Sequence, residues 1–438
     1  MPPAQERGAG AGGLVRGVAV VQQYILQSLT LGDSPAALRM AQQWVTRAPD
    51  AGESWLTLSA VLGRMGSYAD AIRAARRAAA AGLVISRGPE SGWPRVLTLV
   101  TVEQGWCTYQ AGKGMSFATT ADINDGLIDS ARETIVVLNG RDRNIPWGLI
   151  RRHGPFDVLF NAITVAERAP ASLGQVASVA GHLGLPVINQ PDRVARTSRV
   201  GNFEQLQGLT DVYFPRTVAA PLRQRGKAAA AEILGAVERE GFEYPLIVRW
   251  TGYQTGAGMV RCDAPDDVRR LAWPRHVAEA LLIEYVETRS PDGHYRKFRL
   301  FGVGEQLIPR HLLIGDVWML HVSDDSGTAY RNTPGPERDD ILAFDADWEA
   351  WAGPRAASGF RQVQDTIGLD FLGMDCAVLP DGRALIFEAN PAMNLQVLEA
   401  FQEPEDTPHP VRRINAARSR QIARAFAELV QSRCHARD

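Results

Sequence analysis

The chain has 438 residues, of which 45% are hydrophobic and 22% are charged, and its formal net charge at pH 7 is -2. These values are typical of a globular protein with room for two or three domains. They give no electrostatic reason to expect binding to nucleic acid or to an anionic membrane surface.

The N-terminal residues 1–13 lack the basic start and apolar core of a signal peptide, and we expect a disordered lead-in there. No later stretch reaches the roughly 18 uncharged apolar residues that cross a membrane. The four cysteines are scattered without C-x-x-C spacing, which argues against a disulfide framework or a zinc site. Together these features favour a cytoplasmic location.

Residues 14–85 are rich in Ala, Leu and Arg at helical spacing and form the first predicted module. Residues 34 positions apart match weakly, and the pairs are Gly32 with Gly66, Ala37 with Ala71, and Ala41 with Ala75. This period resembles that of tetratricopeptide repeats, whereas a plain helical bundle is the alternative. Two repeats are too few to stand alone, so we expect the module to dock on the rest of the chain or on a partner.

Residues 86–94 carry two Gly and two Pro and are the predicted linker. From 94 to 221, short apolar runs such as RVLTLVTV, ETIVVLNG and FDVLFNAI alternate with helical stretches, which predicts an α/β domain with a small parallel sheet. No G-x-G-x-x-G follows a strand, so a dinucleotide fingerprint is absent. Residues 105–134 show no clear period.

A different pattern begins near residue 222 and predicts an α+β region whose sheets are largely antiparallel. Residues 222–290 contain a helix, the strands YPLIVRW, VRC and ALLIEYV, and a glycine-bearing loop, TGYQTGAGM. Residues 291–438 contain a hairpin-like pair, YRKFRLFGVGEQLIPRHLL, a helix, a second hairpin and a basic amphipathic last helix. In the first of these strands, Lys297 and Arg299 should share one face, because strand side chains alternate.

The second hairpin, GMDCAVLPDGRALIFEANPAMN, places polar side chains at the end of an apolar strand. Glu388 and Asn390 are two positions apart and should therefore share a face. The Asp-Gly turn predicts that Asp375 lies across from them on the partner strand. Such a cluster of oxygen donors suits a hard cation such as Mg²⁺, since clustered acids repel each other without one. An ordinary surface hairpin with a polar end is the alternative.

The order of these parts resembles the ATP-grasp superfamily over residues 94–438. The spacing of Asp375, Glu388 and Asn390 is similar to that of the D-alanine–D-alanine ligase branch, where such residues hold two Mg²⁺ ions. The resemblance implies ATP as cofactor, a parallel domain at 94–221, a central lid subdomain at 222–290, and a catalytic subdomain at 291–438.

The resemblance also implies a set of nucleotide-binding residues. Arg199 and Arg249 stand where the family has its two phosphate-binding cations, although the second is more often Lys. Glycines of the loop after the phosphate-binding strand would cover the phosphates, and the hinge LLIEYVE would receive adenine and ribose. The residues so assigned are Gly256, Gly258, Glu284, Tyr285, Val286, Glu287 and Lys297.

Three further side chains, Arg299, Arg310 and His311, are assigned as a catalytic wall for a substrate carboxylate and its acyl phosphate. The ligase branch carries an Arg two positions before the first metal Asp. This chain has Gly373 there, so we expect another residue, first of all Arg310, to supply that oxyanion donor.

These assignments imply an ATP-dependent ligase that joins a small-molecule or peptide carboxylate to an amine through an acyl phosphate. An ester-forming or phosphotransfer variant, and a nucleotide-binding scaffold without turnover, remain open. The helical repeats could hold a peptide or protein partner, and the sequence leaves a homodimer open. The substrates cannot be read from the sequence, because their specificity depends on loops such as 316–331 and 392–410.

Overall fold

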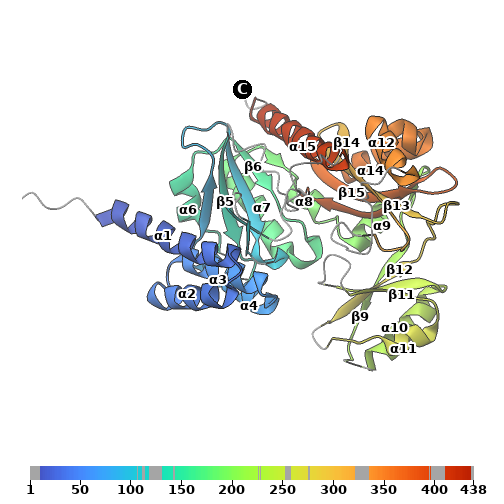
Figure 1. Cartoon of the computed structure of the whole chain (residues 1–438), viewed down its shortest axis with the longest axis horizontal. Helices are drawn as coiled ribbons and strands as arrows, with labels where there is room; N and C mark the ends of the chain where they lie inside the picture. The colour runs from blue at the N-terminus through green and yellow to red at the C-terminus, as the bar shows by residue number, and fades with distance from the viewer. Residues whose placement is uncertain are drawn as a thin grey trace, which may run out of the picture.

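The computed structural model describes residues 10–105, 107–110, 114–117, 131–141, 144–224, 226, 228–251, 258–274, 277–320, 335–393, 395 and 410–435. It has a mixed α/β architecture with three main sheets, which are partly parallel and partly antiparallel (Figure 1). Among the described residues, no helix combines the length and the apolar character needed to cross a membrane.

Four helices form the N-terminal module: α1 (Gly10–Thr30), α2 (Ser34–Arg47), α3 (Gly52–Arg64) and α4 (Tyr68–Ala80). The first helix begins inside the range expected to be a disordered lead-in. Consecutive helices pack against one another, and the side chains that allow this close approach are small and fully buried: Ala37, Ala41, Ala71 and Ala75. The helices of the module therefore pack against one another through alanine side chains.

The first sheet has the strand order β1-β5-β2-β6-β7, formed by Val84–Arg87, Arg132–Leu138, Arg95–Thr101, Val158–Asn161 and Val187–Ile188. Strands β5, β2, β6 and β7 are parallel, as predicted, whereas β1 pairs antiparallel with β5. The predicted linker at 86–94 thus begins inside an edge strand. Short elements η1 (Val102–Gln104), α6 (Trp147–His153), η2 (Ala166–Arg168) and α7 (Pro170–Leu183) connect the strands.

Residues 105–134, which had no predicted structure, contain a small hairpin of β3 (Cys107–Gln110) and β4 (Gly114–Phe117). Strand β3 packs against α3 of the helical module. The hydroxyl of Ser59 accepts a hydrogen bond from the Cys107 N–H at 3.1 Å and donates one to the Ala71 carbonyl at 2.8 Å. The module is therefore docked on the α/β domain, which confirms one of the two expected outcomes.

The second sheet is antiparallel with the order β11-β10-β12-β9, formed by Met259–Cys262, Leu246–Trp250, Glu279–Glu284 and Thr217–Pro221. Its core includes α10 (Ala228–Glu240) and α11 (Pro265–Arg270). Strand β9 lies in the range 94–221 that was predicted to belong to the parallel domain. It instead pairs with β12 through residues 217–221, so the chain enters the central subdomain earlier than predicted.

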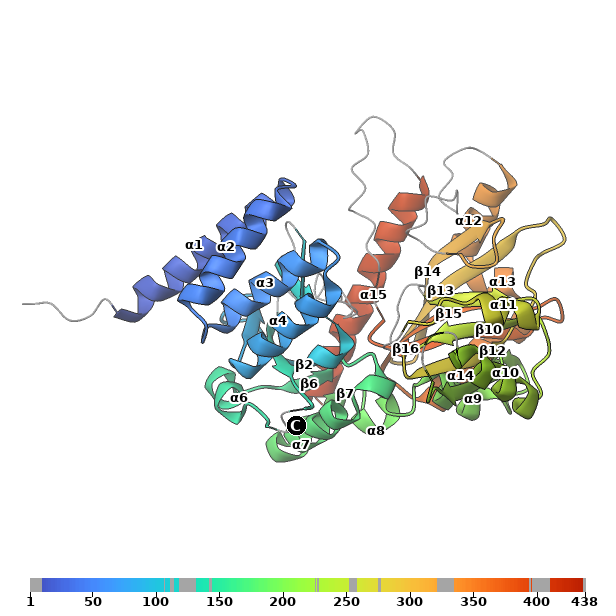
Figure 2. The same ribbon diagram turned by 90° about the horizontal axis from the view of Figure 1, so that it is seen from below.

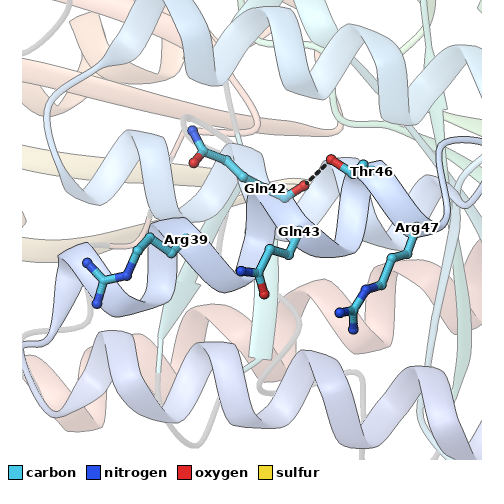
Figure 3. Close-up of a pocket in the computed structure, with 5 residues that line it drawn as sticks. All are labelled: Arg39, Gln42, Gln43, Thr46 and Arg47. Atoms are coloured by element: carbon cyan, nitrogen blue, oxygen red, sulfur yellow. Dashed lines mark hydrogen bonds between the residues drawn. The ribbon is translucent and has the colours of Figure 1, made fainter.

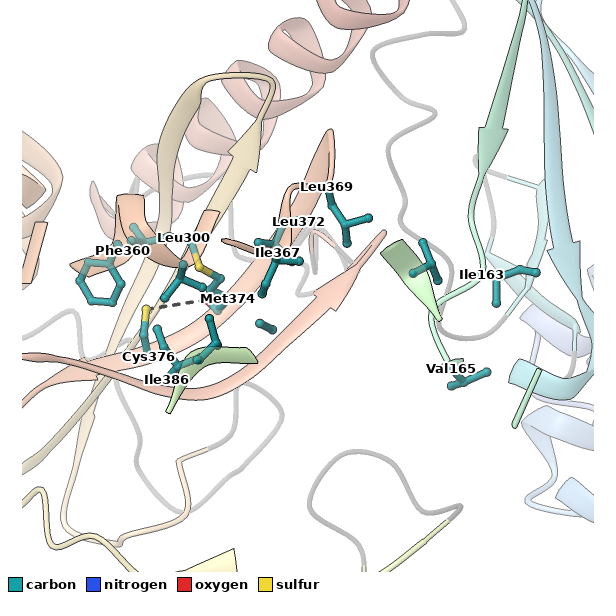
Figure 4. Packing of buried hydrophobic residues seen from close by; sticks show 14 of the residues in the cluster. Ile163, Val165, Leu300, Phe360, Ile367, Leu369, Leu372, Met374, Cys376 and Ile386 are labelled. Carbon is teal, nitrogen blue, oxygen red and sulfur yellow. Dashed lines mark hydrogen bonds between the residues drawn. The ribbon is translucent and has the colours of Figure 1, made fainter. Parts of the chain in front are cut away.

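The third sheet has the order β14-β13-β15-β16-β8, formed by Gln306–Gly315, Tyr295–Val303, Phe371–Val378, Ala384–Pro391 and Val212–Tyr213. Helices α12 (Pro336–Ala346), α13 (Trp348–Ala352) and α14 (Pro354–Ile367) cover its core face. Figure 4 shows Leu300, Met374, Cys376 and Ile386 in this core beside Phe360 of α14. Two short helices, α8 (Pro191–Val194) and α9 (Arg199–Leu206), precede β8.

The last helix, α15 (Pro410–His435), lies between the first and third sheets (Figure 2). Its Phe426 ring meets Phe160 of β6 at 5.0 Å and Phe371 of β15 at 5.2 Å between ring centroids. One apolar core therefore joins the helical module, the parallel sheet and the end of the third sheet. The face of the third sheet that α12–α14 do not cover carries Phe301 and Phe371 of this core at one end and the polar residues of the candidate site beyond them.

Candidate functional site

The hairpin β15–β16 brings the three predicted metal ligands to one place. Asp375 is paired in register with Glu388, and Gly373 with Asn390. The pairing shifts between Asp375 and Cys376, so that Phe387 is an extra, unpaired residue of β16. Without this bulge, Glu388 would share a face with Ile386, which lies in the apolar core. The bulge turns the acid and the amide away from that core.

A second bulge shapes the neighbouring strands. Arg299 of β13 faces His311 of β14, while Leu300 faces Pro309, so Arg310 is the extra residue. The Arg310 side chain is 1% exposed, and its Nε donates to the Leu395 carbonyl at 2.7 Å. The three residues assigned as a catalytic wall therefore lie at one bulge of the β13–β14 pair. Arg299 of this group pairs with Asp375 of β15.

Asp375 is buried and lies between two cations of β13. Its Oδ1 accepts a hydrogen bond from Arg299 Nε at 2.6 Å, and its Oδ2 lies 2.9 Å from Lys297 Nζ. Burial alone would raise the pKa of this carboxyl, but the positive charges of Arg299 and Lys297 outweigh it and hold the pKa far below its usual range. Asp375 is therefore ionised at physiological pH.

Glu388 interacts electrostatically with cations from two other parts of the chain. Its Oε1 accepts hydrogen bonds from Arg199 of α9 and, at 2.7 Å, from Asn390 Nδ2. Burial acts to raise the pKa of Glu388, yet the charges of Arg199 and Arg249 lower it overall. Burial and the charge of Arg199 in turn lower the pKa of Arg249 to about 10, so Arg249 remains a cation.

His311 is 4% exposed, and neither ring nitrogen has a hydrogen-bond partner within the described part of the chain. Burial, followed by the charges of Arg299 and Arg310, lowers its pKa well below the usual value. The imidazole is therefore neutral at physiological pH. A neutral imidazole among cations can donate one hydrogen bond and accept another without adding positive charge to the site.

The predicted adenine hinge lies beside the hairpin. Val286 packs against an apolar cluster of Ala377, Leu379 and Leu385, together with Tyr213 of β8. These three hairpin residues alternate with core residues, so they share the face of Asp375 and Glu388. The hinge and the expected metal ligands are thus joined by a small apolar surface.

The carboxylate of Glu284 braces this junction. It accepts hydrogen bonds from the Tyr213 hydroxyl at 2.5 Å and from the Arg216 N–H at 3.1 Å. Tyr285 lies under the guanidinium of Arg261, 4.1 Å from the ring centroid. The Tyr285 hydroxyl donates to Glu287 at 3.2 Å, and the other Glu287 oxygen accepts from the Arg289 N–H at 2.9 Å.

The glycine loop that follows β10 is described only at its ends. Gly258 adopts a left-handed φ of +70° and its carbonyl accepts a hydrogen bond from the Trp250 N–H at 2.8 Å. Gly256, the other glycine assigned to the phosphates, lies outside the described residues.

Some residues that shape this site were not predicted from the sequence. Glu167, after β6, accepts a hydrogen bond from the Arg199 N–H at 3.0 Å. Asn202 of α9 donates to the Ala389 carbonyl at 2.7 Å and so holds β16 beside α9. Asn189 has a φ of +63° and exchanges hydrogen bonds with both backbone groups of Phe371. An Asn directly after a predicted strand is a weak sequence signal for a left-handed residue. The contacts of Glu167 and Asn202 leave no signal in the sequence.

The donor set fits a divalent cation in its chemistry. Two ionised carboxylates and one carboxamide, all oxygen donors, lie on adjacent positions of one hairpin. In this structure cationic side chains neutralise both acids. No group of three or more His, Cys, Asp or Glu residues in a metal-binding arrangement occurs among the described residues, so Asn390 and any bound phosphate would have to complete the shell.

Gly373 has a structural reason to lack a side chain. A Cβ at this position would lie 2.4 Å from the Cβ of Met393. The Arg expected from the ligase branch therefore has no room here. Arg310, in the bulge of the β13–β14 pair, remains our assignment for the oxyanion donor.

A separate hollow lies on the helical module, away from these residues. It has a volume of about 290 Å³ and is lined by Arg39, Gln42, Gln43, Thr46 and Arg47 of α2 (Figure 3). Its lining residues are all exposed. Thr46 donates to the Gln42 carbonyl at 3.0 Å within the helix.

Neither a protein-family model nor a curated protein sequence matches this chain. Among solved structures, the chain is similar to a RimK-domain ATP-grasp protein from Sphaerobacter thermophilus, with 14% identity and a TM-score of 0.41 over 77% of this chain and 99% of that one. It is also similar to the D-alanine–D-alanine ligase of Coxiella burnetii, with 9% identity and a TM-score of 0.41 over 78% and 95% of the two chains. A third similar structure is the VanG D-Ala:D-Ser ligase of Enterococcus faecalis, with 10% identity and a TM-score of 0.41 over 77% and 99%.

Proposed function

We propose that this chain is an ATP-grasp ligase, which uses MgATP to join a carboxylate to an amine with release of ADP and phosphate. The observation that carries the proposal is the pairing of Asp375 with Glu388 on one bulged hairpin, next to Asn390. Cations from three separate strands or helices converge on these acids: Arg199, Arg249, Lys297 and Arg299.

Each group has a role that its surroundings support. The acids and Asn390 would hold two Mg²⁺ ions, and Arg199, Arg249 and Lys297 would bind the phosphates through charge-assisted hydrogen bonds. The apolar surface between Val286 and Leu385 would contact the adenine ring, with the Tyr285–Val286 backbone at its edge. Glu284 already binds Tyr213 and Arg216, so it would orient the hinge, and Glu287 would contact the ribose.

The reacting carboxylate would lie against the segment formed by Arg299, Arg310 and His311. Magnesium, when bound, offsets the charge of the β- and γ-phosphates so that a carboxylate oxygen can accept the γ-phosphoryl group. Arg299 and Arg310 would stabilise the negative charge of the acyl phosphate. The neutral His311 would orient the carboxylate through a hydrogen bond. Attack of an amine then forms the amide and releases phosphate.

The helical module supports a peptide-binding extension of this proposal. Its weak 34-residue period and its alanine-packed helices match two tetratricopeptide-like units, and stacked repeats present surfaces to extended chains. A peptide held there would present its carboxylate or amine to the ligase domains.

Glu388→Gln tests the assignment of the metal site. The substitution keeps the size of the side chain but removes its charge, so we expect turnover to fall by about 100-fold or more. The measurement is ADP release with pooled carboxylates and amines, combined with calorimetry of MgATP binding. Asp381→Asn, in the exposed turn of the same hairpin, is the matched control and should leave both values unchanged. Equal activity of Glu388→Gln and the control would refute the proposal.

A further inference from the structure

A second polar cluster lies at the carboxyl ends of the parallel strands β2, β5 and β6. Its centre is Glu103, in the turn that follows β2. One oxygen of Glu103 accepts hydrogen bonds from the hydroxyls of Thr101 and Ser172, the latter at 2.9 Å, and from the Gly140 N–H at 3.4 Å. The other oxygen is buried and has no partner among the described residues.

Three arginines lie near this carboxylate, and each comes from a different element. Arg76 belongs to α4 of the helical module, Arg141 follows β5, and Arg168 ends η2. Helix α4 packs against η1, the turn that contains Glu103. Burial and the charges of Arg141 and Arg168 lower the pKa of Arg76, while Glu103 acts in the opposite direction. The four groups are therefore close enough to interact electrostatically.

The cluster has an excess of positive charge that the described chain does not neutralise. Arg76 Nε is buried without a hydrogen-bond partner in the described part of the chain. No ion pair between described residues includes Arg76, Arg141 or Arg168. Three guanidinium groups lie near two carboxylates, Glu103 and Glu167, which leaves a net positive charge. Arg141 and Arg168 are exposed to solvent. A partly buried guanidinium without a partner loses hydrogen bonds to water. A bound anion would replace them with charge-assisted hydrogen bonds.

The same loop connects this cluster with the candidate ligase site. Glu167 accepts a hydrogen bond from the Arg199 N–H, and Arg199 contacts Glu388. The next residue, Arg168, interacts electrostatically with Glu103 as well as with Glu167. Adjacent residues of one short segment, Glu167 and Arg168, therefore link the two clusters.

We propose that Arg76, Arg141 and Arg168 form a carboxylate-binding site at the junction of the helical module and the α/β domain, which holds a second anionic group of the ligase substrate. A planar carboxylate matches the paired N–H groups of a guanidinium better than a spherical anion such as chloride would. Arg76 makes the helical module part of the substrate site. That this anion belongs to the ligase substrate rests on the proposed function, whereas the anion site itself does not.

Calorimetry with citrate at low salt tests the site on the full-length protein, without nucleotide. We expect citrate to bind the unaltered protein, and Arg76→Gln to weaken that binding by about tenfold or more, the usual effect of losing a charged hydrogen bond. Arg141→Gln, on a surface loop that should tolerate it, is expected to cause a comparable loss. Arg77→Gln, on the exposed face of the same helix, is the matched control and should change binding less than twofold.

Absence of citrate binding, or equal binding by the Arg76→Gln and Arg77→Gln proteins, would overturn the proposal. Inorganic phosphate is the second probe, and tighter binding of phosphate than of citrate would overturn the assignment to a carboxylate. MgATP binding is measured on the same proteins and should be unaffected by Arg76→Gln. A protein that binds citrate through Arg76 but does not bind MgATP would retain this site and lose the proposed ligase function.

Discussion

At the scale of single residues, the acids of the candidate site could be predicted from the sequence, but their partners could not. The face shared by Glu388 and Asn390, with Asp375 opposite, follows from strand alternation and an Asp-Gly turn. The ion pair of Glu388 with Arg199 joins positions 189 residues apart, and no local pattern specifies such a contact.

A buried acid outside the site leads to a prediction about pH. Glu133 of β5 is 1% exposed; one oxygen accepts a hydrogen bond from Thr98 at 2.6 Å, and the other has no partner among the described residues. Burial raises the pKa of Glu133, against the weaker effects of Thr98 and Arg87. The unfolded chain therefore loses this proton at lower pH than the folded protein does. Stability from this group declines as pH rises above about 4.3, the unfolded value.

We expect Glu133→Gln to remove this loss, because an amide stays neutral at every pH. The melting temperature of the variant should equal or fall below that of the unaltered protein near pH 4 and exceed it near pH 7. Calorimetric melting at the two pH values measures the effect, with Glu90→Gln, at an exposed position, as control. If the difference in melting temperature does not change with pH, folding does not raise the pKa of Glu133.

At the scale of elements, the strands with regular alternation were predicted well, and the irregular ones were not. The hairpins β13–β14 and β15–β16 and the strands β2, β5 and β6 lie where the pattern places them. The bulges at Phe387 and Arg310 were not predicted, since a one-residue insertion leaves no mark on composition. Strand β1 was assigned partly to a linker because Gly88 and Pro89 follow it directly.

The close contact at Gly373 gives a prediction for β15. A Cβ there would lie 2.4 Å from the Met393 Cβ and 2.8 Å from its sulfur, so Gly373→Ala should lower the free energy of unfolding by about 1–3 kcal/mol through overpacking. Urea denaturation measures this value. Combining it with Met393→Gly, which removes that Cβ as well as the sulfur, should give a double variant less destabilised than the sum of the two single changes. If the two changes in the free energy of unfolding were strictly additive, residues 373 and 393 would not contact each other. Gly174→Ala, where a Cβ meets nothing within 4 Å on α7, is the control.

At the scale of the whole molecule, the apolar cores explain why the helical module belongs to the same folding unit as the sheets. Leu56, Ala60, Ala75 and Ala78 of α3 and α4 share one core with the parallel sheet and with Phe426 of α15. The sequence predicted that so short a module must dock. It could not show where, since the receiving strand β3 lies in the stretch that has no periodicity.

The hydroxyl of Ser59 provides the most direct test of this docking. It is fully buried and is the acceptor for the Cys107 N–H of β3. Ser59→Ala removes this hydrogen bond and the one that the hydroxyl donates to the Ala71 carbonyl, which costs about 1–3 kcal/mol of stability. Because module and sheet share a core, we expect one cooperative unfolding transition at a lower denaturant midpoint, with the slope unchanged. Ser67→Ala is the matched control, since Ser67 begins α4 without a side-chain capping bond. If Ser59→Ala separated the transition into two, the helical module would be an independent domain.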